Sequence, residues 1–312
     1  MRETGDVASE REVEAMRLAI ALSAHGLGST SPNPPVGCVI LDVNGHVVGT
    51  GYHHRKGEPH AEAHALAAAG SRSAGGTAAV TLEPCNHVGR TPPCRQALLD
   101  ARVARVVIAI IDPTSRGEGG AAVLRAAGVD VEVGVLAEEA RLVLGPWLAA
   151  FEAGRPVVTA AYAASDDACD PLGERTLAEL RASVDAVLYR DGRLEEGVPK
   201  SHGRGVVELP SELANVAPTD ALKALYAGGV RTLLLVESKE LAQDYAAAGL
   251  LDRALIYLPG SGESLLPTAG LSPGVVLADF RITGITKTDR HVRLETVPAG
   301  CERWLTGSAR PD

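Results

Sequence analysis

Four residues in the first third of the chain have the types and the spacing that metal-assisted hydrolysis requires. His60 stands two positions before Glu62, and Cys85 and Cys94 follow further along the chain. One imidazole and two thiolates can hold a zinc ion while they leave its fourth tetrahedral position to water. Zinc lowers the pKa of that water toward about 7, so hydroxide is available as a nucleophile at neutral pH. The pattern therefore predicts one catalytic Zn2+ per chain, with His60, Cys85 and Cys94 as its ligands.

Glu62 meets the remaining requirement, which is proton transfer. It lies two residues after a ligand, in the first turn of a predicted helix, so it can reach the bound water without binding the metal. His-x-Glu followed by Pro-Cys and a second Cys is typical of zinc-dependent nucleobase deaminases, in which this Glu moves the protons. We therefore predict that Glu62 is the catalytic acid and base of a hydrolytic deaminase.

The same residues also have other interpretations. Taken singly, a cysteine is usually a small core residue and a histidine lies at the surface, so the joint pattern favours the metal. A closed structural zinc site needs four protein ligands, and His87 could complete one. His60 and His64 have the spacing of a metalloprotease pair, but Glu62 falls at the wrong offset between them, so we reject that pattern.

The surrounding sequence predicts a sheet covered by helices. Ser9 and Glu12 form a capping box at the start of a first helix, and Asn44-Gly45 marks a hairpin. Apolar runs then alternate with helical patterns, which is typical of an α/β domain. The predicted strands cover 36–41, 47–48, 79–82, 103–111 and 129–135, and the predicted helices cover 60–69, 94–101, 119–127 and 136–151, after a first helix that ends near His25.

A second domain is predicted after the Gly and Pro residues of segment 152–156, so we divide the chain into domains 1–152 and 153–312. The second half again alternates strands with helices, which indicates a second α/β domain. Its predicted strands are 184–188, 232–236 and 254–258, its predicted helices are 221–227 and 240–248, and segment 191–217, rich in Gly, Pro and charge, is predicted to be a loop.

Composition and charge exclude several classes of protein. The formal net charge of -9 opposes a sequence-independent grip on nucleic acid, so we expect no nucleic-acid partner. We expect no membrane association, because no apolar run reaches the roughly 18 to 20 residues that cross a bilayer. Residues 1–12 lack the apolar core of a signal peptide, and we expect a cytoplasmic protein. The 5 cysteines are too few and too scattered for a disulfide framework.

Four motifs in the first half resemble, in order, those of the bifunctional riboflavin-biosynthesis deaminase/reductase (RibD) family. The motifs are Pro32-Asn-Pro-Pro-Val-Gly-Cys38, Gly51-Tyr-His53, Pro59-His-Ala-Glu62 and Thr81-Leu-Glu-Pro-Cys-Asn-His-Val-Gly-Arg-Thr-Pro-Pro-Cys94. General cytidine and tRNA adenosine deaminases carry Cys-x-x-Cys, whereas here eight residues separate the two cysteines, as in the riboflavin family. The resemblance implies a cytidine-deaminase-like three-layer α/β/α domain followed by a dihydrofolate-reductase-like α/β domain, in a homodimer or larger homo-oligomer.

The resemblance also implies a substrate and the residues that bind it. The substrate would be diaminohydroxyphosphoribosylaminopyrimidine, deaminated to 5-amino-6-(5-phosphoribosylamino)uracil in riboflavin biosynthesis. The residues implied in binding are Asn33, His53, Arg90 and Asp112. Three of them also have a purely structural interpretation. Asn33 could shape a turn, Arg90 could be a solvated charge, and Asp112 could cap the following segment. Thr114 stands where the family usually has Asn, so one ribose or phosphate contact is expected to differ.

The second half resembles the reductase domain along most of its length but departs from its functional motifs. Segment 161–168 stands where the family has a Lys and Ser-Leu-Asp-Gly, and segment 189–197 replaces a Gly-Thr-Val loop. Glu237-Ser238-Lys239 replaces a Glu-Gly-Gly turn, whose glycines let backbone N–H groups approach phosphate. We therefore predict a degenerate reductase domain, no cofactor-binding residues and no productive binding of NADPH.

Two alternatives stay open at this point. One is a deaminase of a related aminopyrimidine or a guanine-derived nucleotide in secondary metabolism, which Thr114 and the lost reductase motifs favour. The other is a non-catalytic scaffold with a structural zinc, although a carboxylate such as Glu62 has no purpose in a closed site. An editor of nucleic acid is disfavoured by the acidic charge and the cysteine spacing.

Overall fold

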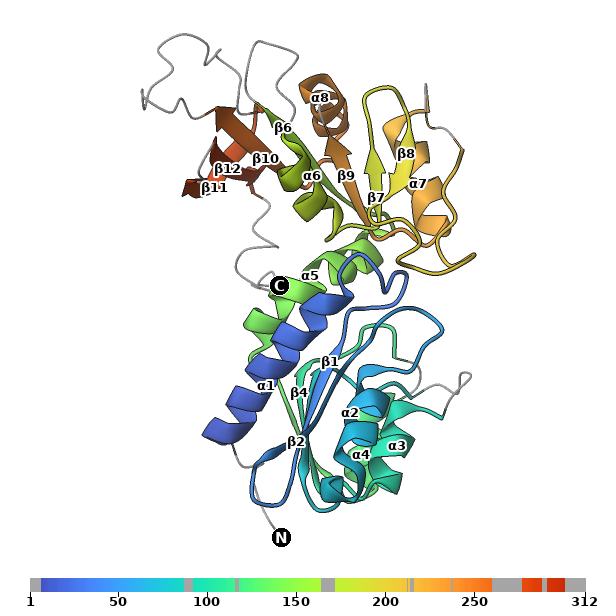
Figure 1. Ribbon diagram of the computed structural model, residues 1–312, viewed down its shortest axis with the longest axis vertical. Helices are drawn as coiled ribbons and strands as arrows, with labels where there is room; N and C mark the ends of the chain where they lie inside the picture. The colour runs from blue at the N-terminus through green and yellow to red at the C-terminus, as the bar shows by residue number, and fades with distance from the viewer. Residues whose placement is uncertain are drawn as a thin grey trace. The chain divides into compact units, whose positions relative to one another are not determined.

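The computed structural model describes residues 7–86, 92–115, 118–163, 172–211, 213, 216–236, 238–259, 277–287 and 291–300. The chain divides into two compact units, 1–148 and 149–312, each with its own sheet (Figure 1). The division lies inside helix α5 (Ala137–Ala153), whereas the sequence prediction places it after Glu152. Within these described ranges, no helix is long and apolar enough to cross a membrane.

The first unit is a sheet between two layers of helices, as predicted. Its strands lie in the order β2-β1-β3-β4-β5, with β1 antiparallel to its two neighbours and β3, β4 and β5 parallel. Helices α1 and α5 cover one face, and α2, α3 and α4 cover the other (Figure 1). The elements are α1 (Glu10–Ser23), β1 (Gly37–Leu41), β2 (Val47–Tyr52), α2 (Ala61–Ala69), β3 (Thr77–Leu82), α3 (Cys94–Asp100), β4 (Arg105–Ile110), α4 (Gly119–Ala126) and β5 (Asp130–Val133), with short 3-10 turns at Ala24–Gly26 and Gly70–Ser73.

The central strands are continuous apolar runs because helices cover both of their faces. Ala79 and Val107 pack against α1 and α5, whereas Val80 and Ile108 pack against the helices of the other face. This alternation follows the two-residue period of a strand. The predicted hairpin is confirmed, since β1 and β2 pair around Gly45, whose φ of 78° suits a glycine.

The second unit contains a larger sheet, in the order β11-β12-β10-β6-β9-β7-β8. Strands β10, β6, β9 and β7 are parallel neighbours, and antiparallel strands complete both edges. Buried side chains pack on both faces of this sheet. The elements are β6 (Val157–Ala163), α6 (Glu174–Arg181), β7 (Ala186–Leu188), β8 (Leu194–Glu196), α7 (Pro218–Ala227), β9 (Thr232–Val236), α8 (Lys239–Ala247), β10 (Arg253–Pro259), β11 (Phe280–Lys287) and β12 (His291–Pro298).

The prediction of a loop over 191–217 is wrong at its start, where β8 pairs antiparallel with β7. A tight turn joins the two strands, in which the Tyr189 N–H donates to the carbonyl of Arg193 at 3.0 Å. Gly192 adopts a φ of 84° in this turn. The sequence pattern missed β8 because the strand has three residues and two of them are Glu, which strands seldom contain.

Arg105 at the start of β4 ties the first helix to the sheet. Its guanidinium donates to Glu12 of α1 at 2.8 Å and also pairs with Asp130 and Glu132 of β5. Burial raises the pKa of Glu12, but hydrogen bonds from Ser9 and the charge of Arg105 outweigh burial and hold that pKa below its usual value. The charged form of Glu12 is therefore a stabilising element of the fold.

Replacing Glu12 with Gln is expected to lower the free energy of unfolding by about 1–3 kcal/mol at pH 7, because hydrogen bonds between charged groups are lost. The pKa of Glu12 is lower in the folded state than its usual 4.5, so this advantage of the wild type is complete above that value. It is lost as the pH falls through the lower folded pKa. Urea unfolding between pH 7 and pH 3 measures the difference, with exposed Glu14→Gln as the control. A difference that persists in acid would contradict the assignment.

Candidate metal centre

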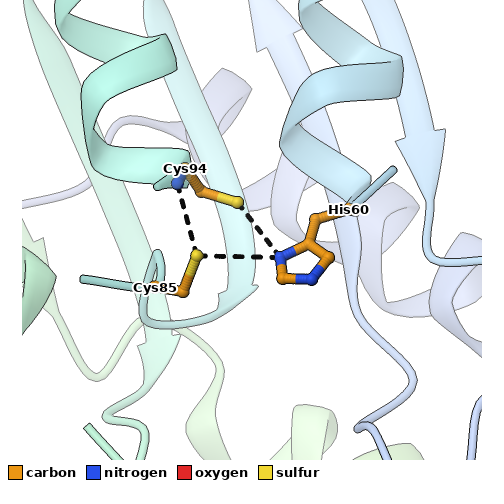
Figure 2. Close-up of side chains that lie close together, drawn as sticks. All are labelled: His60, Cys85 and Cys94. Atoms are coloured by element: carbon orange, nitrogen blue, oxygen red, sulfur yellow. Dashed lines mark hydrogen bonds between the residues drawn. The ribbon is translucent and has the colours of Figure 1, made fainter. Parts of the chain in front are cut away.

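Three elements bring the predicted zinc ligands together at one end of the sheet. Cys85 follows the carboxyl end of β3, His60 precedes the first residue of α2, and Cys94 is the first residue of α3. Figure 2 shows the three side chains converging on one point. Sites beyond the carboxyl ends of parallel strands are common in α/β folds, because loops and helix N-termini meet there.

The spacing of the ligand atoms fits a tetrahedral metal. His60 Nδ1 lies 3.2 Å from Cys94 Sγ and 3.7 Å from Cys85 Sγ. Figure 2 marks both contacts with dashed lines. A nitrogen and a sulfur bound to the same tetrahedral zinc are roughly 3.5 Å apart, given the usual bond lengths. Among the residues that the structure describes, the group of possible ligands contains His60, Cys85 and Cys94 and no fourth side chain. The three described donors therefore fit zinc.

Charge within this cluster also favours a cation. A hydrogen bond from Cys94 lowers the pKa of Cys85 to about 4, with further help from His60, although burial opposes the shift. The pKa of Cys94 is raised because its thiol donates to Cys85 and is buried. By itself the protein therefore accommodates one thiolate easily and resists a second, whereas a divalent cation would stabilise both.

Glu62 lies in the first turn of α2, beside the ligands, and is only 3% exposed. Burial raises the pKa of its carboxyl group, and the nearby charge of His60 partly opposes that effect. Burial that disfavours the charged form makes Glu62 a stronger proton acceptor than an exposed carboxylate. Its place next to the cluster suits the proton transfer predicted from the sequence.

Asn33 and His53 lie together next to the metal ligands. Asn33 Nδ2 is 3.2 Å from His53 Nε2, and His53 Nδ1 is 3.1 Å from the carbonyl oxygen of Pro59. Burial lowers the pKa of His53 to about 4, so its ring is neutral at pH 7. Because a carbonyl only accepts, the Nδ1–H donates to Pro59 and Nε2 accepts from Asn33. The rings of His53 and His60 meet edge to face at 5.1 Å.

Asp112 follows β4 at the same end of the sheet as the ligands. Its Oδ1 accepts from the backbone N–H of Thr114 at 2.8 Å and from the Thr114 hydroxyl at 2.7 Å. Arg90, the fourth residue predicted to bind substrate, and His87, the possible fourth ligand, lie outside the described residues.

The sequence interpretation missed two supporting residues. Trp147 of α5 donates from Nε1 to the carbonyl of Pro32 at 2.9 Å, and so supports the loop that carries Asn33. Glu83, although part of the Glu-Pro-Cys motif, was given no role, yet its buried carboxyl group accepts hydrogen bonds from the segment that follows β4. Neither contact follows from local spacing, because the partners lie far apart in the chain.

The fold and the site define a zinc-binding deaminase. Residues 9–110 match the model of the cytidine and deoxycytidylate deaminase zinc-binding region. The chain is 40% identical over 289 residues to the riboflavin biosynthesis protein RibD of Mycobacterium tuberculosis, with 78% of this chain and 84% of that protein covered. RibD of Corynebacterium ammoniagenes is 33% identical over 297 residues, covering 81% of this chain and 88% of that protein.

Solved structures agree with these relatives over both units. A diaminohydroxyphosphoribosylaminopyrimidine deaminase/5-amino-6-(5-phosphoribosylamino)uracil reductase from Thermotoga maritima matches with a TM-score of 0.74 and 25% identity, covering 93% of this chain and 99% of that one. RibD of Acinetobacter baumannii matches with a TM-score of 0.72 and 27% identity over the same shares. The chain belongs to the RibD family of riboflavin biosynthesis proteins.

Replacing Cys85 with Ala is expected to lower the zinc content from about one ion per chain to well below one, because two protein ligands hold zinc far less tightly than three. Elemental analysis after dialysis against a weak chelator measures the content. Cys38→Ala is the matched control, since Cys38 is buried in the same unit but stands outside the ligand group. Equal zinc content in the two variants would show that Cys85 is not a ligand.

Proposed function

We propose that this protein deaminates diaminohydroxyphosphoribosylaminopyrimidine to 5-amino-6-(5-phosphoribosylamino)uracil, and that it lacks the reductase activity. The observation that carries the deaminase assignment is the group of three ligands with buried Glu62 beside it. The relatives favour a role in riboflavin biosynthesis over a deaminase of secondary metabolism or a non-catalytic scaffold.

His60, Cys85 and Cys94 would hold the zinc, which when bound activates water for attack on the amidine carbon of the pyrimidine. Glu62 takes a proton from the attacking water and gives it to the adjacent ring nitrogen. It then carries the second proton of that water to the amino group, which leaves as ammonia while the ring carbonyl forms. Water is thereby consumed and no oxidant or reductant is needed.

Asn33, Asp112 and Arg90 are proposed to bind the substrate, and His53, which the sequence interpretation placed among the binding residues, is proposed to act by orienting Asn33. The neutral ring of His53 accepts from one Asn33 N–H, which fixes the orientation of the Asn33 amide toward the ligand. Asp112 can accept from a ribose hydroxyl through the oxygen that Thr114 does not engage. A guanidinium such as that of Arg90 suits the substrate phosphate.

Two arrangements at the carboxyl ends of the second unit's parallel strands support the loss of NADPH binding. The first is the N-terminus of α8, where Ser238 accepts from the N–H of Leu241 at 3.0 Å. Ser238 also donates to the carboxyl group of Glu240 at 3.1 Å. A helix N-terminus that already holds a carboxylate repels a nucleotide phosphate instead of attracting one.

The second arrangement is a cluster around Tyr189, directly after β7. The Tyr189 hydroxyl accepts from Arg181 at 2.6 Å and donates to Glu195 at 3.2 Å, and the guanidinium of Arg193 stacks 3.8 Å above its ring. Large side chains thus occupy the place where the family has a Gly-Thr-Val loop. Segment 164–171 and Glu237, where the other departures fall, lie outside the described residues. We propose that the second unit serves stability or assembly in a homo-oligomer.

Replacing Glu62 with Gln is expected to reduce ammonia release from the pyrimidine substrate by roughly 10²- to 10⁴-fold, because the group that carries protons is lost. Zinc content should stay at about one ion per chain, since Glu62 is not a ligand. A coupled ammonia assay and elemental analysis on the same preparation measure both quantities. Unchanged turnover would show that Glu62 does not transfer protons in the reaction.

Titration of the full-length protein with NADPH is expected to show no saturable binding up to millimolar concentration, because charge and side-chain bulk oppose the phosphates. Nucleotide fluorescence follows the titration, and the deaminase/reductase of Thermotoga maritima is the positive control. Saturable binding together with NADPH oxidation by the deaminated product would restore the reductase assignment.

A further inference from the structure

We propose that Glu83 is a positioning residue for the deaminase reaction, which holds Asp112 at the substrate-binding end of the sheet. The proposal rests on the function proposed above in one respect, namely that Asp112 contacts the substrate. Glu83 itself is only 5% exposed and stands two residues before the ligand Cys85. It therefore acts through Asp112 and not on the substrate directly.

The backbone of Glu83 joins the ends of two neighbouring strands. Its N–H donates to the carbonyl of Ile110 at 2.9 Å, which continues the parallel pairing of β3 with β4 by one more bond. This bond places the segment before Cys85 beside the segment that leads to Asp112. The metal ligand and the proposed substrate contact are thus fixed in the same register.

The carboxyl group of Glu83 accepts three hydrogen bonds from the segment that follows β4. Its Oε2 accepts from the backbone N–H of Asp112 at 3.3 Å and from the hydroxyl of Ser115 at 3.0 Å. Its Oε1 accepts from the N–H of Ala121, in the first turn of α4, at 2.9 Å. A buried carboxylate is tolerated only when such donors satisfy it, so these three groups and Glu83 hold one another in place.

Two glycines allow this close approach. A side chain at Gly119 would place its Cβ 2.5 Å from Oε1 of Glu83, and a side chain at Gly120 would place it 1.9 Å from the carbonyl oxygen of Pro84. Gly119 also has a φ of 77°, a backbone conformation that residues other than glycine rarely adopt. The start of α4 is therefore shaped to receive the Glu83 carboxyl group.

Asp112 is then held at two levels. Glu83 fixes its backbone, and Thr114 fixes its carboxylate through two donors to Oδ1. Both Thr114 donors go to Oδ1, and we assign the other oxygen, Oδ2, to the substrate. Loss of the Glu83 charge should therefore weaken substrate binding while the zinc ligands stay in place, since His60, Cys85 and Cys94 make no hydrogen bond to that carboxyl group in the described part of the chain.

The test is a double-mutant cycle in full-length, zinc-loaded protein, with Glu83→Gln, Asp112→Ala and the two changes combined. Glu83→Gln is expected to raise KM for the pyrimidine substrate about tenfold and to leave kcat within about threefold, because it disturbs binding and not the reacting groups. The double variant should have nearly the KM of Asp112→Ala alone, since Glu83 acts through Asp112. Exposed Glu118→Gln, in the same segment, is the control and should match the wild type.

The proposal would be overturned if the KM increases of the two single variants multiply in the double variant. It would also be overturned if Glu83→Gln lowers kcat and loses zinc, because Glu83 would then be a general structural residue. If Glu83→Gln does not fold, Ser115→Ala removes one of the three donors and should raise KM about threefold, again without effect in the Asp112→Ala background.

Amide hydrogen exchange separates this proposal from the proposed function. In Glu83→Gln the N–H groups of Asp112 and Ala121 should exchange about tenfold faster, whereas exchange in α1 stays unchanged. If the exchange rates of both amides stay unchanged, Glu83 does not position this segment, regardless of the measured enzyme activity. Absence of ammonia release from the wild type, with the exchange result as expected, would count against the proposed function alone.

Discussion

The site depends on one electrostatic constraint, which is that two sulfurs and an imidazole meet at one point, where burial and mutual proximity disfavour two thiolates unless a cation is present. The pKa of Cys85 is lowered to about 4 while that of Cys94 is raised, because the Cys94 thiol donates a hydrogen bond to Cys85. Zinc resolves this competition by stabilising both thiolates. The loops and helix starts around the cluster are arranged to keep it compact, and the reaction proposed for the protein begins there.

The fold serves the cluster by ending several elements at the same edge of the sheet. The α2 and α3 helices begin at the cluster, and helix N-termini favour the negative charge of Glu62 and of the Cys94 thiolate. Two further residues hold the neighbouring loops by hydrogen bonds. Trp147 donates to the loop that carries Asn33, and Glu83 accepts from the backbone of Asp112. At the corresponding edge of the second unit, Tyr189 accepts a hydrogen bond from Arg181 and Ser238 accepts one from Leu241.

Local patterns in the sequence predicted the central strands and the metal ligands, but they could not predict hydrogen bonds between residues far apart in the chain. The central strands were predicted because burial on both faces makes each a continuous apolar run, and the spacing of His60, Cys85 and Cys94 predicted a group that the structure brings together. The role of Glu83 could not be predicted, because its hydrogen-bond partners lie 29 to 38 positions away and leave no periodic signal. Strand β8 was missed for a different reason, since a short polar strand is defined by its pairing with β7 and not by its composition.

Zinc K-edge X-ray absorption of the full-length, zinc-loaded protein tests the central claim most directly. The account predicts two sulfur ligands at about 2.3 Å, one imidazole nitrogen and one solvent oxygen at about 2.0–2.1 Å, in a tetrahedral site. A third sulfur, a second imidazole or any other shell made of four side chains would contradict it, because no position would then remain for the reacting water.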